Sequence, residues 1–192
     1  LSELVNDLLD LAKIEAGRVE THVEPVVVDN LFRALKGMLR PLVDEARVEL
    51  IFEPSGIDEP FYSDEGKISQ ILRNFISNAL KFTEQGSVLV FAAHDPEADT
   101  IAFAVADTGI GISPDNLQLI FEEFSQIEHP LQRRSKGTGL GLPLCRKLAD
   151  LLGGRVDVSS TLGVGSTFTL TLPRTPPNRP QQPTMDPDGT AS

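Results

Sequence analysis

The chain has 192 residues, of which 40% are apolar, so it is long enough to bury the core of one domain and too apolar for global disorder. Its formal net charge of -11 argues against nucleic acid or an anionic membrane as the main partner, because both require basic surface. The single cysteine, Cys145, excludes an intrachain disulfide, and its apolar helical surroundings favour packing over reactivity.

No apolar run approaches the ~20 residues of a membrane span, and no signal peptide is visible. Together with the single cysteine, this predicts a cytoplasmic location for the chain, and leaves open a membrane anchor elsewhere in a longer protein. Because Leu1 is not a methionine and falls within a helical pattern, we expect the sequence to be part of a longer protein.

Residues 1 to 18 predict an amphipathic helix whose apolar residues recur at three- and four-residue spacing, and Gly17 ends it. A stripe this apolar needs a partner. Two interpretations stay open: the helix packs on its own domain, or it is half of a helical hairpin whose other half lies upstream.

The rest of the pattern predicts an α+β fold, a two-layer sandwich with a mixed sheet of about five strands and helices on one face, preceded by the N-terminal helix. The predicted strands are 26–28, 48–52, 87–93, 100–106, 155–159 and 166–172, with a further extended segment at 60–62. Four further helices are predicted. The first is capped by Asp29 and broken at Pro41, and the second starts at Ser63 or Asp64 and ends at Phe82. The third is short and starts at Ser113, and the fourth runs from Leu140 to Leu152. Residues 122–138 lack a regular pattern, which is typical of a functional or mobile segment.

The helix expected to end at Phe82 has a polar stripe that includes Asn74, Asn78 and Lys81. Asn74 and Asn78 are four residues apart, so their amides lie one above the other, and asparagine is a mediocre helix former. Either these side chains simply face water, or amide oxygen ligates Mg²⁺ while Lys81 meets phosphate as a point charge.

Two glycine-rich stretches follow. Asp107-Thr108-Gly109-Ile110-Gly111-Ile112 comes directly after a strand, and its carboxylate is placed either to accept a hydrogen bond from an adenine amino group or to form a plain turn. Gly137-Thr138-Gly139-Leu140-Gly141 opens a helix, where backbone N–H groups form an anion site. It is neither a Walker loop nor a Rossmann turn. The basic residues Arg133, Arg134 and Lys136 either reach a phosphate or are solvated.

In this order and spacing, the three motifs resemble the ATP-binding catalytic domain of sensor histidine kinases, within the GHKL superfamily. The resemblance implies ATP and Mg²⁺ as cofactors, with Asn78 as the metal ligand and Asn74 and Lys81 as catalytic residues. It also implies that Phe121-Glu122-Glu123-Phe124 is the family's phenylalanine box, although two core aromatics around a charged turn remain an alternative. The nucleotide-binding residues implied are Asn74, Asn78, Lys81, Phe82, Asp107, Gly109, Gly111, Ile112, Lys136, Gly137, Thr138, Gly139, Leu140, Gly141 and Thr167.

Asn74 stands where related ATPases carry a glutamate that activates water. An asparagine cannot accept a proton at neutral pH, whereas a neutral imidazole needs no base to become a nucleophile. This favours a protein-histidine kinase over a hydrolysing ATPase of the same superfamily, and a non-catalytic nucleotide-binding scaffold remains a second alternative. A related serine kinase fits the leading helix less well.

The resemblance divides the chain into residues 1–22, the second helix of a dimerisation hairpin; 23–174, the ATP-binding catalytic domain; and 175–192, a disordered proline-rich tail. The family phosphorylates a helical His followed by Glu or Asp, and none of His22, His94 and His129 has that context. The partners implied are therefore ATP, a histidine-bearing dimerisation helix outside the sequence, a response-regulator receiver domain and a second copy in a homodimer, with no nucleic acid.

Overall fold

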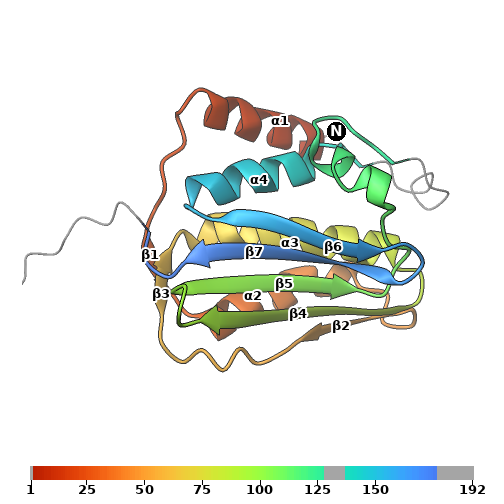
Figure 1. The fold of residues 1–192 in the computed structure, drawn as a ribbon, viewed down its shortest axis with the longest axis horizontal. Helices are drawn as coiled ribbons and strands as arrows, with labels where there is room; N and C mark the ends of the chain where they lie inside the picture. Colours follow the sequence, from red (N-terminus) through yellow and green to blue (C-terminus); the bar gives the residue numbers. More distant parts are fainter. Residues whose placement is uncertain (1, 128–136, 177–192) are drawn as a thin grey trace, which may run out of the picture.

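The computed structural model describes residues 2–127 and 137–176. It contains a mixed five-stranded sheet in the order β2-β4-β5-β7-β6, with β2 and β4 parallel and the other pairs antiparallel (Figure 1). A separate two-stranded sheet joins β1 and β3. The α+β class and the mixed sheet are therefore confirmed.

The strands are β1 (Glu24–Val26), β2 (Val48–Phe52), β3 (Phe61–Ser63), β4 (Gly86–Asp95), β5 (Thr100–Asp107), β6 (Arg155–Thr161) and β7 (Gly165–Pro173). The α-helices are α1 (Ser2–Glu15), α2 (Val28–Leu39), α3 (Glu65–Phe82) and α4 (Gly141–Leu151). Short 3-10 helices occur at η1 (Arg40–Leu42), η2 (Pro114–Asn116) and η3 (Leu119–Phe121).

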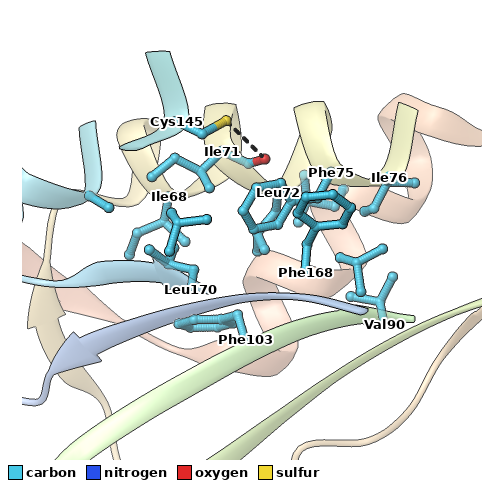
Figure 2. Close-up of a cluster of buried hydrophobic side chains, with 14 of the residues drawn as sticks. Ile68, Ile71, Leu72, Phe75, Ile76, Val90, Phe103, Cys145, Phe168 and Leu170 are labelled. Atoms are coloured by element: carbon cyan, nitrogen blue, oxygen red, sulfur yellow. Dashed lines mark hydrogen bonds between the residues drawn. The ribbon is translucent and has the colours of Figure 1, made fainter. Parts of the chain in front are cut away.

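The core lies between one face of the sheet and helices α2, α3 and α4. Strand β7 alternates strictly, with Ser166, Phe168, Leu170 and Leu172 buried and the residues between them partly exposed. This period of two is what a sheet with one covered face requires. Figure 2 shows Phe75 of α3 beside Phe168, whose ring centroids lie 5.4 Å apart.

Helix α3 crosses this face and carries most of the core. Its buried residues recur every three or four positions, which places them on one side of the helix. Asp64 caps the helix by accepting a hydrogen bond from the Lys67 N–H, as the sequence predicted. Cys145 of α4 is buried against α3 and donates to the Ile71 carbonyl at 3.9 Å (Figure 2), and burial raises the pKa of its thiol. Packing, as predicted, is its role.

One predicted cap is wrong, and a second is correct only in its position. Helix α2 begins two residues earlier than a cap at Asp29 implies, after Val27, and Asp29 instead accepts a hydrogen bond from the Ser55 N–H at 3.0 Å. The third valine of the predicted strand, Val28, therefore belongs to the helix. Ser113 stands at the N-cap of the short helix η2 with Pro114 as its first residue, as predicted, although the Ser113 side chain makes no capping hydrogen bond.

Helix α1 contacts α4 at the edge of the domain (Figure 1). Of its apolar residues only Leu11 is buried, whereas Leu4, Val5, Leu8 and Leu9 are 38–52% exposed. The helix thus uses part of its stripe on its own domain and leaves the rest open to another partner. Among residues 2–127 and 137–176, no helix is long and apolar enough to cross a membrane.

Candidate functional site

A pocket of about 450 Å³ opens where the end of α3, the turn after β5 and the start of α4 meet. The three motifs singled out in the sequence come together here, although they lie far apart along the chain. The predicted residues that line it are Asn74, Asn78, Lys81, Phe82, Asp107, Gly111, Ile112, Gly137, Thr138, Gly139 and Gly141.

Asp107 forms one end of the pocket, at the last position of the central strand β5. Its Oδ1 accepts hydrogen bonds from the backbone N–H groups of Gly109 at 2.8 Å and Ser166 at 3.3 Å. No described residue donates to Oδ2. Burial raises the pKa of this carboxyl, although the two N–H bonds act in the opposite direction. One carboxylate oxygen is thus fixed by the backbone, and the other is left for a donor on a ligand.

The turn after Asp107 is packed tightly on the end of α3. The Ile110 N–H donates to the Phe82 carbonyl at 3.1 Å, and a Cβ at Gly109 would lie 2.3 Å from that same carbonyl oxygen. Only glycine fits position 109. This contact places the Phe82 side chain and the Asp107 carboxylate on the same wall of the pocket.

The two asparagines of α3 form a hydrogen-bonded pair at the centre of the pocket. Asn78 Nδ2 donates to Asn74 Oδ1 at 3.2 Å, which leaves Asn78 Oδ1 free to accept or ligate. A Cβ at Gly141 would lie 2.1 Å from Asn74 Nδ2, so any larger residue at the start of α4 would displace the Asn74 amide from its present position. The pair thus lies directly beside the start of α4.

Lys81 lies beside the glycine-rich turn at the other end of the pocket. A Cβ at Gly137 would be 3.1 Å from Lys81 Nζ, and the ammonium group lies 5.2 Å from the centroid of the Phe82 ring. Burial lowers the pKa of Lys81, and the negative charge of Glu3 partly offsets this. The N-terminus of α4 has no side-chain cap, so its first N–H groups also point toward this region.

Several predicted residues do not line the pocket. Gly109 acts through its backbone N–H, and Leu140 is fully buried in the core. Thr167 lies on β7 between Ser166 and Phe168, which do line the pocket, so strand alternation directs the neighbouring side chains there instead. Lys136, Arg133 and Arg134 lie outside the described residues.

Sequence reasoning missed most of the apolar and small polar lining. These residues include Ser77, Ile110, Ser113, Asn116, Ile120, Leu142, Pro143, Leu162, Ser166 and Phe168. Some of them carried a signal, because each is next to a residue that the resemblance assigned: Ser77, Ile110, Ser113, Leu142, Ser166 and Phe168. The Ser166 hydroxyl lies 2.8 Å from that of Ser160, which accepts the Ile112 N–H at 2.8 Å, so β6, β7 and the turn after β5 are joined.

The two phenylalanines of Phe121-Glu122-Glu123-Phe124 behave differently. Phe121 is buried, with the Arg146 guanidinium 4.1 Å from its ring centroid, whereas Phe124 is 62% exposed and has a positive φ. The Phe124 N–H donates to the Gly139 carbonyl at 3.0 Å, so this segment contacts the glycine-rich turn. His22 and His94 do not line the pocket, and His129 lies outside the described residues.

Two acidic residues of α1, Glu3 and Asp7, also line the pocket, which the sequence did not predict. Thr138 Oγ1 donates to Asp7 Oδ2 at 3.2 Å. Burial raises the pKa of Asp7, the Thr138 hydrogen bond lowers it, and Glu3 and Asp10 raise it further. A larger hollow of about 810 Å³ runs along α1, between this helix, α3, α4 and the end of α2. It shares Glu3, Asp7, Asn74, Ser77 and Gly141 with the pocket.

In the part of the chain that the structure describes, no group of three or more His, Cys, Asp or Glu side chains could hold a metal ion. The donor set of the pocket nevertheless fits Mg²⁺ delivered with a nucleotide. That ion prefers oxygen, tolerates few protein ligands and shares phosphates and waters, and Asn78 Oδ1 is a free oxygen ligand.

Comparison with known proteins places this geometry in context. The chain is 36% identical over 182 residues to hybrid signal transduction histidine kinase B of Dictyostelium discoideum, covering 93% of this chain and 9% of that protein. It is 38% identical to the circadian input-output histidine kinase CikA of Synechococcus elongatus, covering 95% of this chain and 24% of the relative. The chain thus spans a quarter or less of the length of these two relatives.

Solved protein structures are also similar to this chain. The crystal structure of full-length ShkA in complex with AMPPNP matches with a TM-score of 0.79 and 37% identity, over 89% of this chain and 35% of that one. The histidine kinase AdeS of Acinetobacter baumannii, at 22% identity and a TM-score of 0.73 over 90% of this chain and 78% of that one, shares the fold. The family model for histidine kinase-, DNA gyrase B- and HSP90-like ATPases matches residues 63–176, which hold α3, the turn after β5 and the glycine-rich turn, and the chain belongs to this family.

Proposed function

We propose that residues 23–174 are the ATP-binding catalytic domain of a sensor histidine kinase, which transfers the γ-phosphate of Mg-ATP to a histidine on a helix outside this sequence. One observation carries the proposal. Asp107, Asn78 and the glycine-rich turn 137–141 line a single pocket of about 450 Å³, in a chain of the matching family. The AMPPNP bound by the similar protein ShkA is an ATP analogue, which supports a nucleotide here.

The adenine belongs at the Asp107 end. The free Oδ2 of Asp107 accepts a hydrogen bond from the adenine amino group, while the Phe82 side chain and Ile112 provide apolar contact for the ring. Gly111 also lines this end, whereas strand alternation keeps the Thr167 side chain out of the pocket and Ser166 is the β7 residue that contacts Asp107. The partly buried position of Asp107 makes its hydrogen bond selective, because a ligand without the donor leaves a carboxylate unpaired.

The phosphates belong at the other end. Lys81 provides a point charge, and the uncapped N-terminus of α4 with Gly137, Thr138 and Gly139 provides N–H groups for an anion. Asn78 Oδ1 ligates Mg²⁺, which neutralises phosphate charge and orients the γ-phosphate. Lys136 adds a second charge from the segment before the turn.

Phosphoryl transfer, not hydrolysis, fits the central asparagine. Asn74 is hydrogen-bonded to Asn78 and packed on Gly141, so it positions the Mg²⁺ ligand but cannot take a proton from water. Catalysis then consists of positioning and charge neutralisation, which phosphoryl transfer to an existing nucleophile requires.

The exposed apolar residues of α1 support a dimerisation hairpin. Leu4, Val5, Leu8 and Leu9 form an apolar surface on a helix that already uses Leu11 against its own domain. We assign residues 1–22 to the second helix of that hairpin, with the histidine-bearing helix and a second copy as partners. A receiver domain of a response regulator then takes the phosphate.

Isothermal titration calorimetry with ATP and Mg²⁺ tests nucleotide binding by the chain, and incubation with radiolabelled ATP tests the reaction. We expect binding, no acid-labile label on the chain alone, and little phosphate release. Steady phosphate release without an acceptor would instead support an ATPase, and failure to bind ATP would support a scaffold module. Acid-labile label on the isolated chain would contradict the assignment of the acceptor to another helix.

A further inference from the structure

The phosphate half of the proposed nucleotide site carries negative charge from α1. Glu3 and Asp7 line the same pocket as Asn78, Lys81 and the glycine-rich turn. Burial lowers the pKa of Lys81, and the nearby Glu3 carboxylate partly offsets this effect. The helix thus brings two carboxylates to the place where an anionic ligand would bind.

Donors of the glycine-rich turn are already used in this arrangement. The Thr138 hydroxyl donates to Asp7 Oδ2 at 3.2 Å and accepts the Leu140 N–H, also at 3.2 Å. A phosphate oxygen at this place would have to displace a carboxylate from the same hydroxyl. Asp7 therefore stands in for the acceptor that the turn otherwise offers to a phosphate.

Few contacts hold α1 in this position. Leu11 is its single buried apolar residue, Ile14 is partly buried against the core, and an open hollow of about 810 Å³ runs along the helix. Two polar contacts near the surface add to these: Gln70 Nε2 donates to Asp10 Oδ2 at 3.0 Å, and Lys147 Nζ donates to Glu15 Oε1 at 2.5 Å. Surface contacts of this kind stabilise little, so undocking α1 costs mainly the burial of Leu11 and Ile14 and leaves the rest of the core in place.

Helix α1 ends at Glu15, and the linker after it is attached to α3. Gly17 has a φ of 65°, in the left-handed region that favours glycine. Shortly beyond it, Lys67 Nζ donates to the Glu20 carbonyl at 2.8 Å, and the His22 N–H donates to Asp64 Oδ2 at 2.9 Å. The linker is therefore fixed to the start of α3, whereas, among the residues that the structure describes, the few contacts named above hold the helix before Gly17.

We propose that docked α1 is an acidic gate on the phosphate half of the site, in which Asp7 and Glu3 oppose nucleotides in proportion to their phosphate charge. A bound triphosphate takes the Thr138 hydroxyl from Asp7 and releases α1. The docked chain thus discriminates against ATP relative to ADP and adenosine. This inference rests on the proposed function, because it assumes that the pocket binds an adenine nucleotide.

Asp7→Asn tests the gate, since asparagine still accepts the Thr138 hydrogen bond but carries no charge. Asp10→Asn is the matched control: it makes the same charge change one turn along α1, keeps an acceptor for Gln70, and lies outside the nucleotide pocket. Calorimetry compares ATP, ADP and adenosine in the presence of Mg²⁺. We expect Asp7→Asn to tighten ATP binding about tenfold, which is the order of magnitude for one nearby charge. The same variant should tighten ADP binding less and leave adenosine binding unchanged.

Hydrogen exchange on the unaltered chain provides a second measurement. We expect ATP, but not adenosine, to accelerate exchange of the α1 amides, because an undocked single helix frays. Weaker ATP binding by Asp7→Asn would overturn the gate and make Asp7 part of a cation site. Equal effects of the two variants, or α1 protection that ATP leaves unchanged or increases, would also overturn it while the proposed function stands. If neither ATP nor adenosine binds to any variant, the proposed function fails, and the gate with it.

Discussion

Replacing Asp107 with asparagine separates recognition of the base from stability of the fold. Asp107 Oδ1 accepts the N–H groups of Gly109 and Ser166, so an asparagine keeps its oxygen there and places Nδ2 where Oδ2 stands. An amide N–H₂ group would then face the amino group of adenine, and two donors cannot pair. The change removes an acceptor and adds a repulsive contact without changing the shape of the side chain.

The expected loss follows from the partial burial of this carboxylate. A hydrogen bond with a charged partner contributes about 1–3 kcal/mol, so ATP and adenosine should both bind about 5- to 150-fold more weakly. Stability should not fall. Burial raises the pKa of Asp107 above its unfolded value, so the ionised carboxylate destabilises the fold at neutral pH, and this cost disappears as pH falls through the folded pKa. A neutral asparagine avoids that cost at every pH.

Calorimetry with adenosine and ATP, together with thermal unfolding in the absence of ligand, measures both effects. Asp115→Asn is the control, because it makes the same charge change at an exposed residue just beyond the same turn. Unchanged affinity of Asp107→Asn for adenosine, with an intact fold, would refute the assignment of Asp107 to the base. A large drop in melting temperature would refute the claim that the backbone bonds need only one oxygen.

Three other changes test the remaining parts of the structure. Gly141→Ala places a Cβ 2.1 Å from Asn74 Nδ2, so we expect Mg-ATP affinity to fall by about 1–3 kcal/mol, measured by calorimetry. Lys81→Met removes the positive charge beside the phosphates, so it should weaken ATP binding about tenfold or more and leave adenosine binding unchanged in the same calorimetric assay. Asp64→Ala removes a buried cap and should cost about 0.5–2 kcal/mol in urea unfolding at neutral pH. Burial alone would raise the pKa of Asp64, but its hydrogen bonds lower that pKa below the unfolded value. The difference in unfolding free energy between the unaltered chain and Asp64→Ala should therefore shrink as pH falls through the lowered pKa.

The sequence was informative where one physical rule acts alone. Helix α3 follows from its apolar period and from Asp64 at its start, and both were predicted to within a residue or two. Strand β7 follows from alternation. The order β2-β4-β5-β7-β6 could not be predicted, because strand pairing depends on which faces meet in three dimensions.

Prediction failed where a polar side chain had a choice of partners. Asp29 suits a helix cap as well as Asp64 does, yet it binds the Ser55 N–H, which lies 26 residues away in sequence. Likewise, nothing in the pattern of α1 indicated that Asp7 would meet Thr138, 131 residues later. Contacts of this kind depend on tertiary structure and leave no periodic signal.

The negative charge of the pocket explains why ATP binding depends on a bound divalent cation and on the N-terminus of α4. Among its lining residues that the structure describes, Lys81 is the only basic side chain, against the three carboxylates of Glu3, Asp7 and Asp107. The chain as a whole carries a formal net charge of -11, so a polyphosphate approaches against an unfavourable field. Affinity for ATP therefore has to come from a divalent cation, from the N–H groups at the start of α4, and from the base. Because these contributions are few, moving one helix with two carboxylates is enough to change which nucleotide the pocket prefers.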